Sequence, residues 1–262
     1  MLNKKLRIVK FKGGLGNQLF QYGLYKYFES KNYKVYADLS FYQNQKKYKK
    51  ISQRKFYLNK ILKKNLNVIK KSKNMYQFLI SQKLEKFFTK LLKLDVNLPL
   101  SSWEGYWQDI FFAKYVRKKD FKEEFFKTFE KIPKKYFILH YRSGDFKYSE
   151  SHIVINHEYY LKALKRFKKL PIIALSDDNK NLKKMLKKIN INKKIIELKK
   201  INTLESFKIL VAANGGICSN STFSWWGSFI NEKKNWVYPY KWLKNINTED
   251  TNLKISKNKI IK

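Results

Sequence analysis

The sequence predicts an α/β fold with two lobes. Short apolar runs alternate along the chain with segments whose apolar residues have helical spacing, which is the pattern of α/β proteins. Most of these runs are too apolar to alternate with polar residues, which is typical of strands buried in parallel sheets. The length of 262 residues, with 44% hydrophobic and 17% aromatic residues, fits two folded lobes of about 100 to 150 residues each.

The first half of the chain begins with a predicted strand, a glycine-rich turn and a helix. The run "RIVKF" (7–11) predicts the strand, and "GGLGNQLFQY" (13–22) predicts the turn and the start of the helix. A second strand is expected in "YKVYADL" (33–39). The helix is predicted from apolar residues at i, i+4, i+7 and i+8, namely Phe20, Leu24, Tyr27 and Phe28.

The glycine turn has two chemical interpretations. Gly14 and Gly16 match two glycines of the dinucleotide-binding pattern G-x-G-x-x-G, and Asp38 ends the next strand, where a ribose-binding acid is expected. The third glycine of that pattern is absent. The turn instead carries Asn17 and Gln18, whose side chains can hydrogen-bond a ligand directly at the helix N-terminus. A tight strand–helix turn without a ligand is the structural alternative.

Residues from about 45 to 130 form a basic, helix-rich region. We expect the apolar stripe in "LEKFFTKLLKLDV" (84–96) to pack against the protein's own core, although a basic amphipathic helix can also lie on a membrane. The run "KIPKK" (131–135) predicts a boundary between two lobes, residues 1–130 and residues 131–262. The segment after Trp242 is polar, and we expect it to be a loose tail of the second lobe. The stripe consists of Leu84, Phe87, Phe88, Leu91 and Leu92.

Polar residues follow the first predicted strand of the second half, "YFILHY" (136–141). His140, Arg142 and Asp145 lie where this strand ends, and the carboxyl ends of parallel strands are where α/β proteins bind ligands. Only five of the 58 Lys and Arg residues are arginine, so Arg142 indicates a need for a planar, bidentate donor at this position. A strand-end ion pair with Asp145 is the structural alternative.

Three further strands are expected in "PIIALS" (171–176), "NGGICS" (214–219) and "WVYPY" (236–240). Asp177 and Asp178 follow the first of these, where they can cap the next helix or bind a divalent metal. We expect no metal site, because the two carboxylates are not spaced as D-x-D and the three histidines lack ligand spacing. After "NGGICS", hydroxyls and backbone N–H groups at a helix start predict either an anion site or an ordinary N-cap. The residues there are Ser219, Asn220, Ser221 and Thr222.

The net charge of +38 comes almost entirely from lysine. Arginine is the residue that forms bidentate hydrogen bonds with phosphates and bases, and this chain contains few arginines. The excess charge is therefore interpreted as a solvated basic surface, with attraction to nucleic acid or membranes as the alternative. The single cysteine, Cys218, excludes an intramolecular disulfide. No secretory signal and no apolar run of about 18 residues is present, which predicts a cytosolic protein that is peripheral to a membrane at most.

Six different motifs follow one another along the chain: "GGLGNQLFQY" (13–22), "GYWQDIFF" (105–112), "HYRSGDF" (140–146), "HEYYLKAL" (157–164), "LSDD" (175–178) and "SNSTFSWWGSFI" (219–230). In this order they closely resemble the bacterial α-1,2-fucosyltransferases of glycosyltransferase family 11. The resemblance covers nearly the whole chain, and six motifs in the family's order are more specific than any one of them.

The resemblance implies a GT-B architecture, in which two Rossmann-like lobes face each other across a cleft. The carboxyl lobe would hold GDP-β-L-fucose, and the amino lobe would present the acceptor. The implied activity is that of a galactoside 2-α-L-fucosyltransferase, which transfers fucose with inversion to the 2-hydroxyl of galactose without a required metal. The absence of a D-x-D motif agrees with this.

The resemblance also implies roles for individual residues. Gly14, Gly16 and Asn17 would form a turn facing the cleft, with Asn17 reaching the pyrophosphate or the transferred sugar. Arg142 matches the first arginine of the H-x-R-R-x-D signature and would grip the β-phosphate of GDP, where the helix start would help to hold the developing charge. The other implied donor-binding residues are His140, Asp145, Asp177, Asp178, Asn220, Ser221 and Thr222.

Two positions depart from the family pattern. Ser143 stands where the second signature arginine is expected, which removes one positive charge from the phosphate side. Ser206 stands where an acidic residue usually opens the segment before "SNST", with Glu205 beside it. Glu205 is therefore the candidate for donor binding. The sequence identifies neither the residue that recognises guanine nor the general base.

The expected acceptor is a galactose-containing cell-surface glycan, as in lipopolysaccharide or capsule biosynthesis, assembled at the inner face of the membrane. Three alternatives remain. The enzyme could transfer another GDP-activated deoxysugar, such as a colitose-like one, because the motifs report GDP better than they report the sugar. The protein could instead bind nucleic acid through its basic surface, or be an inactive relative that only binds sugar.

Overall fold

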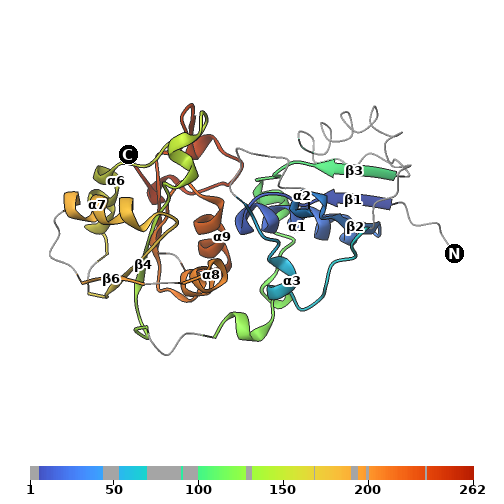
Figure 1. The fold of residues 1–262 in the computed structure, drawn as a ribbon, viewed down its shortest axis with the longest axis horizontal. Helices are drawn as coiled ribbons and strands as arrows, with labels where there is room; N and C mark the ends of the chain where they lie inside the picture. Colours follow the sequence, from blue (N-terminus) through green and yellow to red (C-terminus); the bar gives the residue numbers. More distant parts are fainter. Residues whose placement is uncertain are drawn as a thin grey trace. The chain divides into compact units, whose positions relative to one another are not determined.

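The computed structural model divides the chain into two compact units, Met1–Phe121 (unit 1) and Lys122–Lys262 (unit 2). Both are drawn in Figure 1. The structure describes residues 6–43, 53–69, 90, 100–127, 132–167, 169–189, 194–198, 201–233 and 235–262.

The observed boundary lies closer to the N-terminus than the predicted division between residues 130 and 131. The short 3₁₀ helix η4 (Glu123–Phe125) packs on the second unit, where the buried ring of Phe125 lies 5.8 Å from the ring of Phe207. Lys208 also donates a hydrogen bond to the carbonyl of Glu124. The boundary is therefore set by these packing contacts, which the Pro- and Lys-rich composition of "KIPKK" does not reveal.

The described strands of unit 1 form a parallel sheet in the order β2-β1-β3. They are β1 (Leu6–Lys10), β2 (Lys34–Asp38) and β3 (Leu100–Glu104), and Leu6 pairs with both Lys34 and Leu100. Helix α1 (Leu15–Ser30) connects β1 to β2, as the sequence predicts.

The predicted apolar face of α1 is buried. Phe20, Leu24 and Phe28 have no exposed surface, and a short helix, α5 (Ile110–Ala113), packs against the same helix. The approach of α5 requires Gly23, because a Cβ there would lie 2.5 Å from the carbonyl oxygen of Phe112. Further short elements are α2 (Ser40–Gln43), α3 (Leu58–Ile61) and η3 (Lys118–Asp120).

The predicted amphipathic stripe of residues 84–96 lies outside the described residues, apart from Lys90. Among the helices that the structure describes, none combines the length and the apolar composition needed to cross a bilayer.

In the described part of unit 2, six parallel strands form a sheet in the order β11-β8-β7-β4-β5-β6. Counted along the chain, this is the doubly wound order 3-2-1-4-5-6 read from the other edge, so the topology reverses between β4 and β7. The strands are β4 (Phe137–Tyr141), β5 (Ile172–Ser176), β6 (Ile195–Glu197), β7 (Gly216–Ile217), β8 (Trp236–Pro239) and β11 (Ile260–Ile261).

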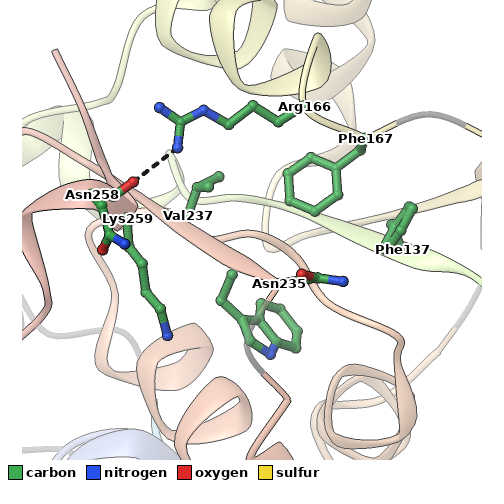
Figure 2. Close-up of a pocket in the computed structure, with 8 residues that line it drawn as sticks. Phe137, Arg166, Phe167, Asn235, Val237, Asn258 and Lys259 are labelled. Atoms are coloured by element: carbon green, nitrogen blue, oxygen red, sulfur yellow. Dashed lines mark hydrogen bonds between the residues drawn. The ribbon is translucent and has the colours of Figure 1, made fainter.

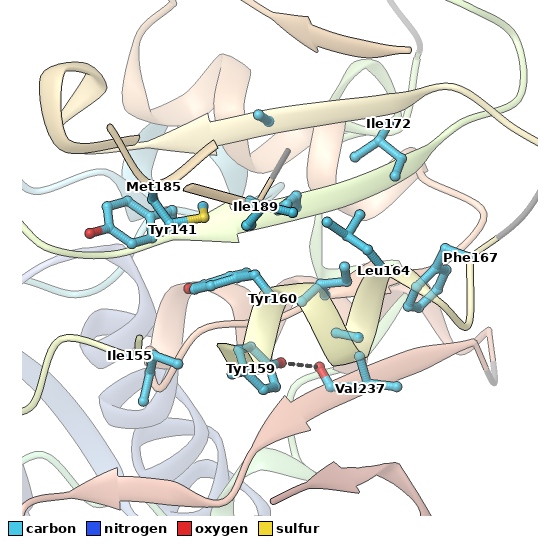
Figure 3. Packing of buried hydrophobic residues seen from close by; sticks show 14 of the residues in the cluster. Tyr141, Ile155, Tyr159, Tyr160, Leu164, Phe167, Ile172, Met185, Ile189 and Val237 are labelled. Atoms are coloured by element: carbon cyan, nitrogen blue, oxygen red, sulfur yellow. Dashed lines mark hydrogen bonds between the residues drawn. The ribbon is translucent and has the colours of Figure 1, made fainter. Parts of the chain in front are cut away.

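Helices cover both faces of this sheet. In Figure 1, α6 (His157–Leu164) and α7 (Asn179–Ile189) lie on one face, and α8 (Thr203–Ala212) and α9 (Thr222–Asn231) lie on the other. Figure 3 shows the core under α6, where Tyr159 and Tyr160 are fully enclosed among apolar residues. Their hydroxyls are satisfied by backbone carbonyls, with Tyr159 donating to Cys218 and Val237 and Tyr160 donating to His140.

The tail after Trp242 is not loose, so that prediction is wrong. Residues 246–247 form β10, which pairs with β9 (Lys241–Leu243), and two 3₁₀ helices follow, η6 (Thr248–Asp250) and η7 (Lys257–Lys259). The last strand, β11, then extends the main sheet beside β8. Two apolar residues of this largely polar segment, Leu253 and Ile261, are buried and anchor it.

Candidate functional site

The carboxyl ends of β4 and β7 meet at the switch point of the unit 2 sheet, where doubly wound proteins bind their ligands. The loop after β4 carries Arg142 and Asp145, and the loop after β7 leads into α9. The adjacent strand β5 ends at Ser176, followed by Asp177 and Asp178. We call the group of Arg142, Asp145, Lys147, Asp177 and Asp178 the strand-end cluster.

Arg142 is held by two carboxylates. One terminal nitrogen lies 2.6 Å from Oδ1 of Asp145, and the other lies 3.1 Å from Oδ2 of Asp177. The guanidinium also lies over the ring of Phe146, 5.1 Å from its centroid. Its Nε is buried without a hydrogen-bond partner in the structure, so one donor of this group is unused. The strand-end ion pair with Asp145, which the sequence left open as the structural alternative, is present, and it orients the guanidinium.

Asp177 also shapes the loop that carries Arg142. Its Oδ1 accepts a hydrogen bond from the backbone N–H of Ser143, and a Cβ on Gly144 would lie 2.2 Å from its Oδ2. The "RSGD" turn therefore needs glycine in order to close around this carboxylate. Gly144 was missed by sequence reasoning, although its place within the H-x-R-x-x-D pattern was a signal for it.

Asp178 caps α7, which is the structural alternative that the sequence left open. It accepts hydrogen bonds from the backbone N–H and the side-chain amide of Asn181. Lys147 donates a further hydrogen bond, and this contact is the main reason that the pKa of Asp178 is lowered to about 2. Within the described residues, no group of three or more Asp, Glu, His or Cys side chains is arranged to hold a metal ion.

The strand-end cluster contains two cations and three carboxylates, so its net charge is negative by one. Attraction of a diphosphate to this edge therefore cannot come from the summed charge of the cluster. It would have to come from directed N–H donors, namely the guanidinium of Arg142 and the first turn of α9.

His140 links the two central strands. Its Nδ1 lies 2.9 Å from the hydroxyl of Ser219, and its ring stacks on Phe223 of α9. Burial, followed by the positive charge of Arg142, lowers the pKa of His140 to about 3, so the imidazole is neutral at physiological pH. With only 5% of its surface exposed, His140 positions the loops at the switch point and is a supporting residue.

The segment that leads into α9 is a capped helix start. Ser221 is the N-cap, and its hydroxyl accepts a hydrogen bond from the N–H of Phe223. Thr222 opens the helix beside it and is partly exposed. The amide of Asn220 is buried and donates to the carbonyls of Ile153 and Trp242, so this side chain ties its own loop to the loop of Ile153 and to β9.

Glu205 closes a capping box at the start of α8. Its carboxylate accepts a hydrogen bond from the backbone N–H of Asn202, whose side chain in turn caps the N–H groups of Leu204 and Glu205. The structure thus gives this carboxylate a helix-capping contact, and donor binding by Glu205 stays a prediction.

The glycine turn of unit 1 lies at the carboxyl end of β1. Gly13 has φ +81°, Gly14 is the N-cap of α1, and Gly16 lies inside the first helical turn. The left-handed conformation that requires glycine is therefore at Gly13. Asp38, considered above as a ribose-binding acid, accepts a hydrogen bond from the backbone N–H of Ser40.

Gln18 does not face a ligand, so that interpretation is wrong. Its side chain is fully buried, donates to the carbonyls of Gly13 and Lys55, and accepts from the N–H of Tyr57. Gln21, which sequence reasoning missed, is buried in the same way and joins the N–H of Lys12 to the carbonyl of Gly105. Polar residues one helical turn apart in an otherwise apolar helix were the signal.

Asn17, by contrast, is partly exposed on the surface of the turn. Its Oδ1 accepts a hydrogen bond from the side-chain amide of Gln108 at 3.1 Å. Gln108 belongs to "GYWQDIFF", so the structure brings the first two motifs of the family pattern together.

Unit 2 also contains a cavity of about 550 Å³ next to the start of β4 and β8 (Figure 2). Phe137 and Trp236 are the first residues of these strands, and Arg166, which donates to the carbonyl of Asn258, lies at its rim. Since Arg142 follows the other end of β4, the cavity lies at the opposite edge of the sheet from the strand-end cluster.

No protein-family model matches the sequence, and no curated protein matches it either. Solved structures of the α-1,6-fucosyltransferase NodZ are similar in fold. The structure co-crystallised with GDP has a TM-score of 0.53 and 10% sequence identity, covering 87% of this chain and 92% of NodZ. A crystal soaked with GDP-fucose (TM-score 0.54, 9% identity, 87% and 92% covered) and a structure of NodZ from Bradyrhizobium (TM-score 0.54, 10% identity, 87% and 93% covered) give the same result.

This similarity concerns the fold. It confirms the predicted α/β class and GT-B architecture, with a parallel sheet and helices in each of the two units. At 10% identity it does not carry over the activity or the linkage that NodZ makes.

Proposed function

We propose that the protein transfers L-fucose, with inversion, from GDP-β-L-fucose to the 2-hydroxyl of a galactose residue. The observation that carries this proposal is the guanidinium of Arg142, fixed at the switch point of unit 2 by Asp145 and Asp177. The six family motifs and the fold similarity to a fucosyltransferase crystallised with GDP support the same donor.

Transfer from a GDP-sugar requires stabilisation of the departing diphosphate. Arg142 has five N–H donors in a rigid fork, and its two carboxylate contacts leave further N–H groups for phosphate oxygens. The partial positive charge of the α9 N-terminus, capped by Ser221, would act on the same anion. His140 supports both loops as a neutral residue, so it adds no charge that changes near neutral pH.

The linkage is the finer part of the proposal. The motif resemblance favours the 2-hydroxyl of galactose, whereas the proteins of similar fold are α-1,6-fucosyltransferases. Incubation with GDP-fucose and a panel of β-galactosides, followed by linkage analysis of the products, tests this directly. An α-1,6 product would overturn the linkage while leaving fucosyl transfer intact.

The donor sugar is tested by comparing GDP-fucose with other GDP-activated deoxysugars under the same conditions. Faster turnover of another sugar would replace fucose in the proposal. A nucleic-acid-binding protein would instead show strong, salt-dependent binding of duplex DNA, with Arg142 no more important than a surface lysine. Release of GDP from GDP-fucose would exclude a relative that only binds sugar.

We further propose that turnover requires no divalent metal, because cationic and helix-terminal groups are available to take the metal's role. The test is turnover of GDP-fucose in excess chelator. Loss of activity with EDTA and recovery with Mg²⁺ or Mn²⁺ would make Asp177 and Asp178 metal ligands.

The acceptor is proposed to be a surface glycan assembled at the inner face of the cytoplasmic membrane, which a cytosolic protein of net charge +38 could approach electrostatically. Cell fractionation at low and high salt tests the peripheral contact. Fully soluble protein at both salt concentrations would remove that part of the proposal and leave the chemistry unchanged.

A further inference from the structure

An aromatic ring is held out into solvent next to the glycine turn of unit 1. Tyr106 is 47% exposed, although it lies two residues after the end of β3 and directly before the buried Trp107. Trp107 has φ +51°, a left-handed conformation that is costly for a bulky residue and that is found preferentially at functional sites. The backbone therefore bends after Gly105 so that Trp107 enters the core while Tyr106 points away from it.

The ring of Tyr106 lies among polar side chains of the same unit. A Cβ on Gly13 would be 3.3 Å from Cε1 of Tyr106, which places the ring directly beside the glycine turn. Lys12 approaches the ring, with its Nζ 5.2 Å from the centroid. Two residues further along the chain, the amide of Gln108 bonds to Asn17 on the same turn.

A carboxylate is linked to this group through Lys12. Glu104, the last residue of β3, forms ion pairs of 3.1 Å with both Lys10 and Lys12, and 44% of its side chain is exposed. Burial acts to raise the pKa of Glu104, but the hydrogen bonds and charges of Lys12 and Lys10 outweigh it, so its pKa lies below the ordinary value. Glu104 is thus an ionised hydrogen-bond acceptor at neutral pH.

An exposed aromatic face with amide and carboxylate groups around it matches the chemistry of a pyranose. In β-galactosides the C–H groups at positions 3, 4 and 5 form an apolar face that can pack on an aromatic ring, while the hydroxyls need polar partners. We propose that Tyr106 is the platform on which the galactose ring of the acceptor stacks, with Glu104 and the Asn17–Gln108 pair as partners for its hydroxyls. This inference rests on the proposed function for the identity of the sugar.

Saturation-transfer NMR with methyl β-D-galactoside, in the absence of donor, tests the platform directly. We expect saturation of H3, H4 and H5 with the wild-type protein, retention of the signal in Tyr106→Phe, and its loss in Tyr106→Ala. The matched control is Tyr36→Ala, because Tyr36 is also a partly exposed tyrosine of unit 1 with a lysine over its ring, at 5.5 Å. The control should keep the signal.

Steady-state kinetics provides the second measurement. Tyr106→Ala is expected to raise the KM for the β-galactoside by up to about 10-fold, as the loss of one aromatic contact implies, with less than about a 2-fold change in the KM for GDP-fucose. An unchanged signal and an unchanged acceptor KM in Tyr106→Ala, or no galactoside signal with the wild type, would overturn the inference. Tyr106-dependent binding of galactoside without any turnover of GDP-fucose would instead refute the proposed function and leave the platform standing.

Discussion

The loops that follow the first strand of each sheet are held in place by different forces. In unit 1, the glycine turn is fastened by neutral amides, since the fully buried Gln18 and Gln21 bond to backbone groups. In unit 2, the loop after β4 is fastened by charges, with Arg142 bound to Asp145 and Asp177.

This difference has a chemical consequence. Buried amide hydrogen bonds do not respond to an arriving anion, so the turn of unit 1 forms a fixed support for exposed groups such as Asn17. Ion pairs at a partly exposed edge can exchange a carboxylate for a phosphate, because both are acceptors for a guanidinium. The charged loop is thus suited to a ligand that arrives as an anion, and the neutral turn to an uncharged one.

The largest expected effect is that of Arg142→Lys, which keeps the charge and removes the fork. A lysine cannot donate two parallel hydrogen bonds to diphosphate oxygens, and Ser143 leaves no adjacent guanidinium to compensate. We expect a loss of roughly 10²- to 10³-fold in kcat/KM for GDP-fucose, or about 2.7 to 4 kcal/mol, with the fold intact.

The control for this variant is Arg166→Lys, at an exposed arginine that bonds only to the carbonyl of Asn258 among the contacts described. It should leave kcat/KM nearly unchanged. Near-normal transfer by folded Arg142→Lys would show that the arginine is structural, and the charged loop would then be a scaffold like its neutral counterpart.

Gln18→Leu tests the neutral side of the comparison. The substitution leaves the carbonyls of Gly13 and Lys55 and the N–H of Tyr57 without this partner, and unsatisfied buried groups cost about 1 to 3 kcal/mol each. Allowing for partial compensation by water, we expect a loss of about 3 kcal/mol in the free energy of unfolding, measured by urea denaturation. The exposed Gln43→Leu should change it by less than about 0.5 kcal/mol. Equal stability of the two variants would mean that the turn is not held by Gln18.

His140 makes the charged edge sensitive to acid. Its pKa is about 3 in the folded protein and about 6.5 when unfolded, so between these values the unfolded state binds a proton that the folded state does not. Stability is therefore fully present above pH 6.5 and falls as the pH decreases. Between pH 6.5 and pH 5 the wild type should lose about 2 kcal/mol more than His140→Asn, which cannot be protonated. Parallel pH profiles of the two proteins would show that His140 is not buried as a neutral residue.

The smallest effect is expected for Glu205, which decides between a cap and a donor contact. Glu205→Ala removes an acidic residue from the first turn of α8 and should cost roughly 0.3 to 1 kcal/mol of stability, whereas Glu205→Gln should restore the capping hydrogen bond. Neither should alter the KM for GDP-fucose if the carboxylate acts only as a cap. A raised KM in Glu205→Gln at unchanged stability would instead assign Glu205 to the nucleotide.

Local patterns in the sequence were sufficient to predict the α/β class, the first strand, turn and helix, and the positions of Arg142 and Asp177 at strand ends. These features depend on periodicity and on glycine punctuation, which act over a few residues. The same patterns wrongly predicted a loose tail after Trp242, because the burial of Leu253 and Ile261 depends on packing against the rest of the folded unit.

Only the tertiary structure decided which polar residues face solvent. Asn17 and Gln18 are neighbours of similar chemistry, yet one lies on the surface of the turn and the other is enclosed by a segment about forty residues away in the chain. Tyr106 and Trp107 are likewise adjacent aromatic residues, yet Tyr106 is exposed and Trp107 is buried. The positive φ of Trp107 accompanies this change of direction. A linear sequence states what each side chain can do. Which of them can reach a ligand depends on contacts between distant segments, and those contacts exist only after the chain has folded.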